Sequence, residues 1–190
     1  KELRDQFMFY VPEELDKILE TTPNCKFIYV IPDFQNPTGR TWSMERRQKF
    51  MEVVNKHNLP VLEDNPYGEL RFEGEILPSL KSMDTKGLVM FLGTFSKVFC
   101  PGLRLGWVAA DKGVLSEFIK IKQSADLHTS NFDQGVADAY MEAYDLDAHV
   151  AKICDLYRHR RDLILATMEA ELPAGCTWTH PEGGLFLWLS

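Results

Sequence analysis

The first group in this sequence that could do covalent chemistry is a lysine beside hydroxyl side chains. Lys97 ends the run Gly93-Thr94-Phe95-Ser96-Lys97, which directly follows a compact apolar segment. A lysine amine attacks an aldehyde only when it is partly deprotonated, and burial or a nearby cation lowers its pKa in that direction. The alternative is that Lys97 is an ordinary solvated charge in a loop.

A carboxylate and a phenol form a second cluster, in the run Glu63-Asp64-Asn65-Pro66-Tyr67. A buried carboxylate that faces a pyridine nitrogen keeps this nitrogen protonated, so that the ring can take up electrons from a carbanion. Asp64 could have this role, and the hydroxyl of Tyr67 could reach the same ring. The alternative is that Asp64 only caps a turn or a helix.

Two further residues could bind the polar ends of such a ring. Asn36, in Asn36-Pro37-Thr38-Gly39, offers an amide donor, although this run is also typical of a simple turn. Arg104 carries a fork of donors that could grip a phosphate, with the hydroxyls of Thr94 and Ser96 adding hydrogen bonds. The alternative for Arg104 is a salt-bridged residue at a strand edge. Gly93 and Gly102 would let the backbone come close to the phosphate.

Alternating strands and helices must position these side chains. Apolar runs predict strands at about 27–31, 59–62, 88–92 and 105–109, and helical patterns cover 12–20, a stretch capped by Ser43, a stretch from 112, and 146–172. This order is typical of an α/β fold with a mostly parallel sheet and helices on both faces. Ligands bind at the carboxyl ends of the strands in such sheets, so one crevice could gather all the clusters. Together they supply each part of a site for pyridoxal 5′-phosphate.

The C-terminal third has a different character. Short strands at about 176–179 and 184–189 indicate the beginning of a smaller α/β domain. We therefore expect residues 1–130 to be part of a large cofactor-binding domain, and residues 131–190 to be connecting helices and the truncated beginning of a C-terminal domain. Because an apolar run is still in progress near Ser190, we expect the chain to be a piece of a longer protein.

The set of motifs resembles the fold-type I, class I/II aminotransferases that depend on pyridoxal 5′-phosphate. The context Pro101-Gly102-Leu103-Arg104-Leu105-Gly106-Trp107 is similar to the subgroup of 2-aminoadipate and kynurenine aminotransferases and to the cofactor domains fused to GntR-type (MocR-type) transcription regulators. The resemblance implies that Lys97 forms the internal aldimine and shuttles a proton, with Asp64 and Tyr67 as further catalytic residues. It implies the following cofactor-binding residues: Asn36, Asp64, Tyr67, Thr94, Ser96, Lys97 and Arg104. Thr94 stands where the family more often has serine.

Three functions are consistent with these residues. The leading one is an aminotransferase that acts on an amino acid and a 2-oxo acid, as a homodimer by resemblance. A lyase or decarboxylase on the same fold, and the ligand-sensing domain of a transcription regulator, are the alternatives. The family's arginine for the substrate α-carboxylate would lie beyond Ser190, so we expect the isolated 190 residues to be inactive.

Composition narrows the setting. Hydrophobic residues make up 45% of the chain, which is typical of a globular protein. The formal net charge is −7, and this acidic charge argues against nucleic-acid binding by this segment. No apolar run is long enough for a membrane span. The histidines and cysteines form no pattern of metal ligands, so no metal site is expected. Four scattered cysteines suggest free thiols in a reducing, cytoplasmic compartment: Cys25, Cys100, Cys154 and Cys176.

Overall fold

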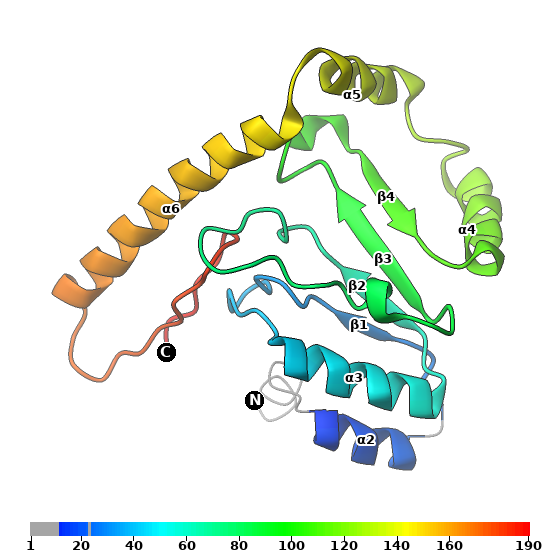
Figure 1. Ribbon diagram of the computed structural model, residues 1–190, viewed down its shortest axis with the longest axis horizontal. Helices are drawn as coiled ribbons and strands as arrows, with labels where there is room; N and C mark the ends of the chain where they lie inside the picture. The colour runs from blue at the N-terminus through cyan, green and yellow to red at the C-terminus, as the bar shows by residue number, and fades with distance from the viewer. Residues whose placement is uncertain (1–11, 23) are drawn as a thin grey trace.

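A four-stranded sheet forms the centre of the computed structural model, which describes residues 12–22 and 24–190 (Figure 1). Strand β1 (Ile28–Val30) pairs with β2 (Val61–Asp64), and β2 with β3 (Val89–Thr94), both in parallel. Strand β4 (Gly106–Ala109) lies antiparallel to β3, so the order is β1-β2-β3-β4. The expected α/β fold with a mostly parallel sheet is confirmed.

Two helices cover one face of this sheet. Helix α3 (Met44–His57) begins because the side chain of Ser43 accepts a hydrogen bond from the backbone N–H of Arg46, and it ends at Asn58 in a left-handed conformation. Helix α2 (Pro12–Thr21) packs against α3. The core between helices and strands has side chains that are fully buried, and each contributes about 1.5–3 kcal/mol by burial: Val54, Val61 and Val89.

Strand alternation gives neighbouring acidic residues opposite surroundings. Glu63 shares the α3 face with Val61 and is 1% exposed, whereas Asp64 points to the opposite face together with Leu62 and its partner Tyr29. Tyr29 is half-exposed on that face. Two consecutive carboxylates therefore have separate roles, one inside the core and one at a surface.

The rest of the chain contains further helices and two short 3₁₀ turns, of which η1 (Lys81–Met83) precedes β3 and η2 (Pro101–Leu103) follows it. Helix α4 (Lys112–Ala125), helix α5 (Asn131–Ala143) and helix α6 (Leu146–Glu171) follow β4. The bounds expected for the long helix are confirmed to within one residue. Helix α6 extends away from the sheet, and near its start Val150 and Cys154 pack with Leu70, Phe72 and Val98.

The C-terminal segment differs from the expectation, because the two strands expected after α6 are not regular strands. Two isolated bridges are present instead, Trp178 with Leu189 and Arg71 with Gly183. Gly184 has a φ of 73°, and the segment leaves its own hairpin to pair with residues 70–73 in the large sheet's loops. Because the segment pairs partly with itself and partly with residues 70–73, neither pairing is long enough to form a regular strand. The division of the chain at residues 130/131 stays a prediction.

Candidate active site

The predicted ring-binding side chains come from the carboxyl ends of neighbouring parallel strands. Asp64 is the last residue of β2, and Asn36 lies in the loop that follows β1. The hydroxyl of Tyr29 donates a hydrogen bond to Oδ2 of Asp64. Partial burial, and then the hydrogen bond to this carboxylate, raise the pKa of Tyr29. Tyr29 therefore keeps its proton and holds one oxygen of Asp64 in place.

Tyr67 lies at the same edge, and both Asn36 and Asp64 influence its hydroxyl. It is 6% exposed, and burial raises the pKa of its hydroxyl; a hydrogen bond with the Asn36 side chain acts in the opposite direction, and the charge of Asp64 raises the pKa further. The ring of Phe186 meets the Tyr67 ring edge-on, with 5.4 Å between centroids. The structure thus brings Asn36, Asp64 and Tyr67 together.

The candidate phosphate-binding residues form a second group. Arg104 has a left-handed backbone (φ 55°) and is exposed, and its Nη1 donates to Oγ of Ser96 at 3.4 Å and to the carbonyl of Pro101 at 3.1 Å. The hydroxyl of Thr94 accepts from the Ser96 N–H at 3.1 Å and donates to the carbonyl of Leu105 at 3.2 Å. The proton of Thr94 is therefore engaged by the backbone, while Arg104 and Ser96 face each other.

The two glycines expected to admit a phosphate have different surroundings. Gly93 pairs across strands with Trp107, and a Cβ at Gly93 would overlap the indole ring. Phe91 stacks on the same indole at 5.3 Å between centroids. Trp107 is thus the physical reason for a glycine at position 93. At Gly102 a Cβ would meet only the sulfur of Cys100, at 3.8 Å.

Lys97 lies in the turn that follows β3. The backbone N–H of Phe99 donates to the carbonyl of Phe95 at 2.9 Å, which closes the turn, and Val98 is buried against Leu70 and Phe72. Lys97 itself is half-buried, and no hydrogen bond or ion pair joins its amine to another of the described residues. The burial of Val98 fixes the point from which the Lys97 side chain starts.

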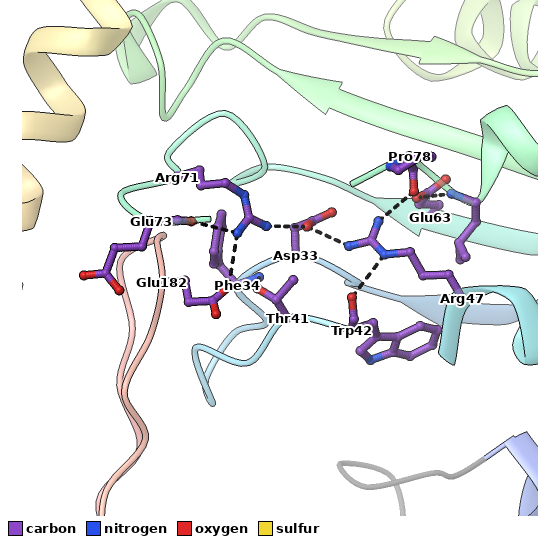
Figure 2. Close-up of polar contacts among 11 residues, drawn as sticks. Asp33, Phe34, Thr41, Trp42, Arg47, Glu63, Arg71, Glu73, Pro78 and Glu182 are labelled. Carbon is purple, nitrogen blue, oxygen red and sulfur yellow. Dashed lines mark hydrogen bonds and ion pairs between the residues drawn. The ribbon is translucent and has the colours of Figure 1, made fainter. Parts of the chain in front are cut away.

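A network of buried charges lies beneath these loops and was not anticipated from the sequence (Figure 2). Arg47 is fully buried and donates to Oδ1 of Asp33 at 2.7 Å and to the carbonyls of Trp42 and Pro78. The sequence did contain a signal, because Arg47 falls on the same stripe of α3 as Met44 and Met51. A charged residue on an apolar stripe needs a buried partner.

Glu63 lies in the same buried region. It accepts hydrogen bonds from the backbone N–H groups of Leu80 and Lys81, both at 2.8 Å. Burial raises the pKa of Glu63, while these hydrogen bonds and the charge of Arg47 act in the opposite direction. The strand that ends in Asp64 is thereby tied to the segment around residue 80.

Comparison with known proteins identifies the family. Residues 11–190 match the family model for aminotransferase class I and II. The chain belongs to this family. Aromatic-amino-acid aminotransferase 1 of Thermococcus litoralis is 43% identical over 176 residues, which are 93% of this chain and 42% of that protein. The HTH-type transcriptional regulator YisV of Bacillus subtilis is 33% identical over 87% of this chain and 34% of its own length.

The fold of this aminotransferase-family chain matches solved structures as well. A crystal structure of a Pyrococcus horikoshii kynurenine aminotransferase superposes with a TM-score of 0.88 at 40% identity, covering 93% of this chain and 44% of that one. The predicted resemblance is therefore confirmed, and the family depends on pyridoxal 5′-phosphate. The chain spans less than half the length of these relatives. In the part of the chain that the structure describes, no helix is long and apolar enough to cross a membrane.

Proposed function

We propose that this chain is the cofactor-binding core of a pyridoxal 5′-phosphate-dependent aminotransferase, which moves an amino group between an amino acid and a 2-oxo acid. The observation that carries the proposal is that Asn36 and Asp64 follow or end two neighbouring parallel strands, with Tyr67 close to both. These are the two donors and the carboxylate that a pyridoxal ring requires, and family membership supports the same assignment.

The residues present fit the cofactor at each of its polar groups. Arg104 and Ser96 lie 3.4 Å apart and provide a charged fork and a hydroxyl for the phosphate. Asn36 and Tyr67 provide donors for the phenolic oxygen. Asp64, held at one oxygen by Tyr29, provides a carboxylate for the ring nitrogen. When bound, the cofactor supplies an electron sink for the bond that breaks at the substrate's α-carbon.

Each chain residue then has a defined task. Nζ of Lys97 would hold the cofactor at its aldehyde carbon and, with substrate in its place, would move the proton at the substrate's α-carbon. The Asp64 carboxylate would accept a hydrogen bond from the protonated ring nitrogen, which would strengthen the electron sink. The Tyr29 hydroxyl orients that carboxylate. Ser96 and Arg104 keep the ring from shifting while the proton moves.

A borohydride experiment tests this proposal on the natural full-length protein. With added pyridoxal 5′-phosphate we expect a yellow adduct that borohydride reduces, and peptide mapping should find the pyridoxyl group on Lys97. Lys97→Ala should abolish this adduct, because no other amine follows β3 at the edge where the candidate residues gather. Survival of the reducible adduct in Lys97→Ala would falsify the assignment.

The similarity to an HTH-type regulator supports a second candidate function, in which this domain binds the cofactor and an effector without turnover. The two candidates are separated by measuring transamination and DNA binding of the natural full-length protein. Turnover without DNA binding supports the aminotransferase, and the reverse supports the regulator. A lyase or decarboxylase would instead release ammonia or carbon dioxide without needing a 2-oxo acid.

The natural protein is further proposed to form a homodimer, as the family resemblance implies. Large apolar side chains on α4 and α5 support this, because Ile119, Ile121 and Phe132 are each at least 60% exposed. Such exposed apolar groups are typical of surfaces covered by other protein. Sedimentation of the natural protein at twice the mass of one chain is the expected result.

A further inference from the structure

One aspartate joins two buried arginines, and this junction lies between the loops that carry the ring-binding residues (Figure 2). Oδ1 of Asp33 accepts from Nη2 of Arg47 at 2.7 Å and from Nη2 of Arg71 at 3.4 Å. The side chains are 9% exposed for Asp33, fully buried for Arg47 and 8% exposed for Arg71. Buried ion pairs of this kind are weak evidence for stability, because desolvation offsets their attraction, so a role in specifying geometry has to be considered.

Arg71 joins its own loop to two other segments at once. Its Nη2 reaches Asp33, three residues before Asn36 in the loop after β1. Its Nη1 donates to the Glu182 carboxylate at 3.2 Å, in the C-terminal segment, and to the carbonyl of Glu73 at 3.1 Å. The guanidinium also lies over the ring of Phe34, 4.8 Å from its centroid, and Phe34 is fully buried.

Backbone hydrogen bonds hold the same segments together around Arg71. The N–H of Phe72 donates to the carbonyl of Glu182, and the N–H of Gly184 donates to the carbonyl of Leu70, each at 2.8 Å. A Cβ at Gly183 would overlap the Phe34 ring and the Leu70 carbonyl. The C-terminal segment therefore fits against both loops with no free space at this point.

The segments that Arg71 joins also contact the candidate site residues Tyr67 and Asn36. The N–H of Leu70 donates to the carbonyl of Tyr67 at 2.8 Å, so the segment that holds Arg71 also holds Tyr67. Phe186, two residues after Gly184, packs edge-on against the Tyr67 ring. Asn36, which bonds the Tyr67 side chain, lies on the loop held through Asp33. Displacement of Arg71 would change the placement of Tyr67 relative to Asn36.

We propose that Arg71 is a positioning residue that sets the placement of Tyr67 relative to Asn36, and through them the two donors for the cofactor's phenolic oxygen. This inference rests on the proposed function for its consequence at the cofactor, but its geometric part concerns only residues of this chain. Arg71 acts through Tyr67 and Asn36 and does not itself touch the cofactor.

The test compares Arg71→Met, Arg71→Lys and Val54→Ala in the natural full-length protein. Val54 is a fully buried residue of α3 with no contact to the network around Arg71, so Val54→Ala is the control for loss of stability alone. With pyridoxal 5′-phosphate bound, we measure the pH at which the visible absorption changes. A lost or misplaced donor makes the phenolic oxygen and the conjugated nitrogen more basic, so Arg71→Met should move this midpoint to higher pH by about 0.5 to 1 unit, as Tyr67→Phe should.

The variants should separate positioning from stability. Arg71→Lys keeps a cation for Asp33 or Glu182 but cannot reach both, and it should restore part of the shift. Val54→Ala should lower the melting temperature and leave the midpoint unchanged. A melting temperature lowered in Arg71→Met with an unchanged midpoint would mean that Arg71 is only structural, and the inference would be wrong.

A second readout needs no cofactor and distinguishes failure of the two proposals. In the cofactor-free protein, NMR titration of tyrosine labelled at the ζ carbon reports the pKa of Tyr67, which burial raises. Arg71→Met should raise this pKa further, as Asn36→Ala should, because the hydrogen bond with the Asn36 side chain, which lowers the pKa, is lost. If the wild type forms no adduct with the cofactor, the proposed function fails and this titration still decides the role of Arg71. An unchanged Tyr67 pKa in Arg71→Met contradicts it.

Discussion

At the scale of single residues, consecutive acidic groups of this chain are distinguished by their hydrogen-bond partners. Glu63 faces the core and bonds two backbone N–H groups, while Asp64 faces the other side of the sheet and accepts from the Tyr29 hydroxyl. A carboxylate for a pyridinium nitrogen has to stay ionised and fixed in orientation. Tyr29 supplies the second of these conditions, and it is the residue of the candidate site that the motifs did not include.

A carboxylate outside the candidate site, Asp84, allows a prediction of pH-dependent stability. Burial alone would raise the pKa of Asp84, but hydrogen bonds from the N–H of Val89, the Lys81 ammonium and two further N–H groups outweigh it and lower the pKa to about 2. A pKa below the usual 3.8 means that the ionised form stabilises the fold. This contribution is present above about pH 4 and is lost as the pH falls toward 2, and it is of order 2 kcal/mol.

Asp84→Asn should therefore lower the free energy of unfolding by roughly 2 kcal/mol at pH 7, and the difference from wild type should shrink as the pH falls from 4 toward 2. Urea denaturation at several pH values measures this. Asp126→Asn is a matched control, since its ion pair with Lys122 is largely exposed. A difference for Asp84→Asn that stays constant with pH would contradict the assigned cause.

At the scale of elements, the ends of helices and strands position the candidate site. Helix α3 begins at Ser43 directly after the loop that carries Asn36, and its Arg47 reaches back to Asp33 in that loop. The same loop contacts the C-terminal segment, where the Thr179 hydroxyl donates to the carbonyl of Thr38 at 2.8 Å. The loop is therefore held on one side by the helix that follows it and on the other by a segment 141 residues away.

Gly183 tests how closely the C-terminal segment must approach. Gly183→Ala places a Cβ against the Leu70 carbonyl and the Phe34 ring, and it should destabilise the protein by about 1–3 kcal/mol because the backbone must shift. Gly135 of α5 has open space around its Cβ position, so Gly135→Ala should be neutral or stabilise by up to about 1 kcal/mol. Thermal denaturation of both variants measures the contrast, and equal stabilities would show that the close approach carries no energy.

At the scale of the whole molecule, the chain leaves much apolar surface uncovered. Trp107 and Val108 of β4 are 47% and 40% exposed, in addition to the apolar groups of α4 and α5. The chain also spans only 42% of its aminotransferase relative from Thermococcus litoralis. These observations agree with a domain core whose exposed apolar side chains are covered by other parts of the natural protein or by a partner subunit.

The isolated 190 residues are therefore not expected to catalyse transamination. An assay with several amino donors and 2-oxo acids, run in parallel on this chain and on the natural full-length protein, measures this directly. The full-length protein should turn over, while the isolated chain should not, because this chain spans only 42–44% of the length of its relatives and, by resemblance, the arginine for the substrate α-carboxylate lies beyond it. Turnover by the isolated chain would contradict the prediction.

Local patterns in the sequence determined the types and order of the main elements and predicted the candidate site residues. Apolar runs marked all four strands, and the polar residues that follow them predicted a site with Asn36, Asp64, Tyr67 and Lys97, because the carboxyl ends of parallel strands meet at one edge. Only the tertiary structure decided which side chains hold these residues. Tyr29 and Asp64 are 35 positions apart, and Arg71 and Glu182 are 111 apart. No local periodicity links residues at such separations, and the C-terminal strands were misjudged for the same reason, since their pairing partner lies in a loop of the large sheet.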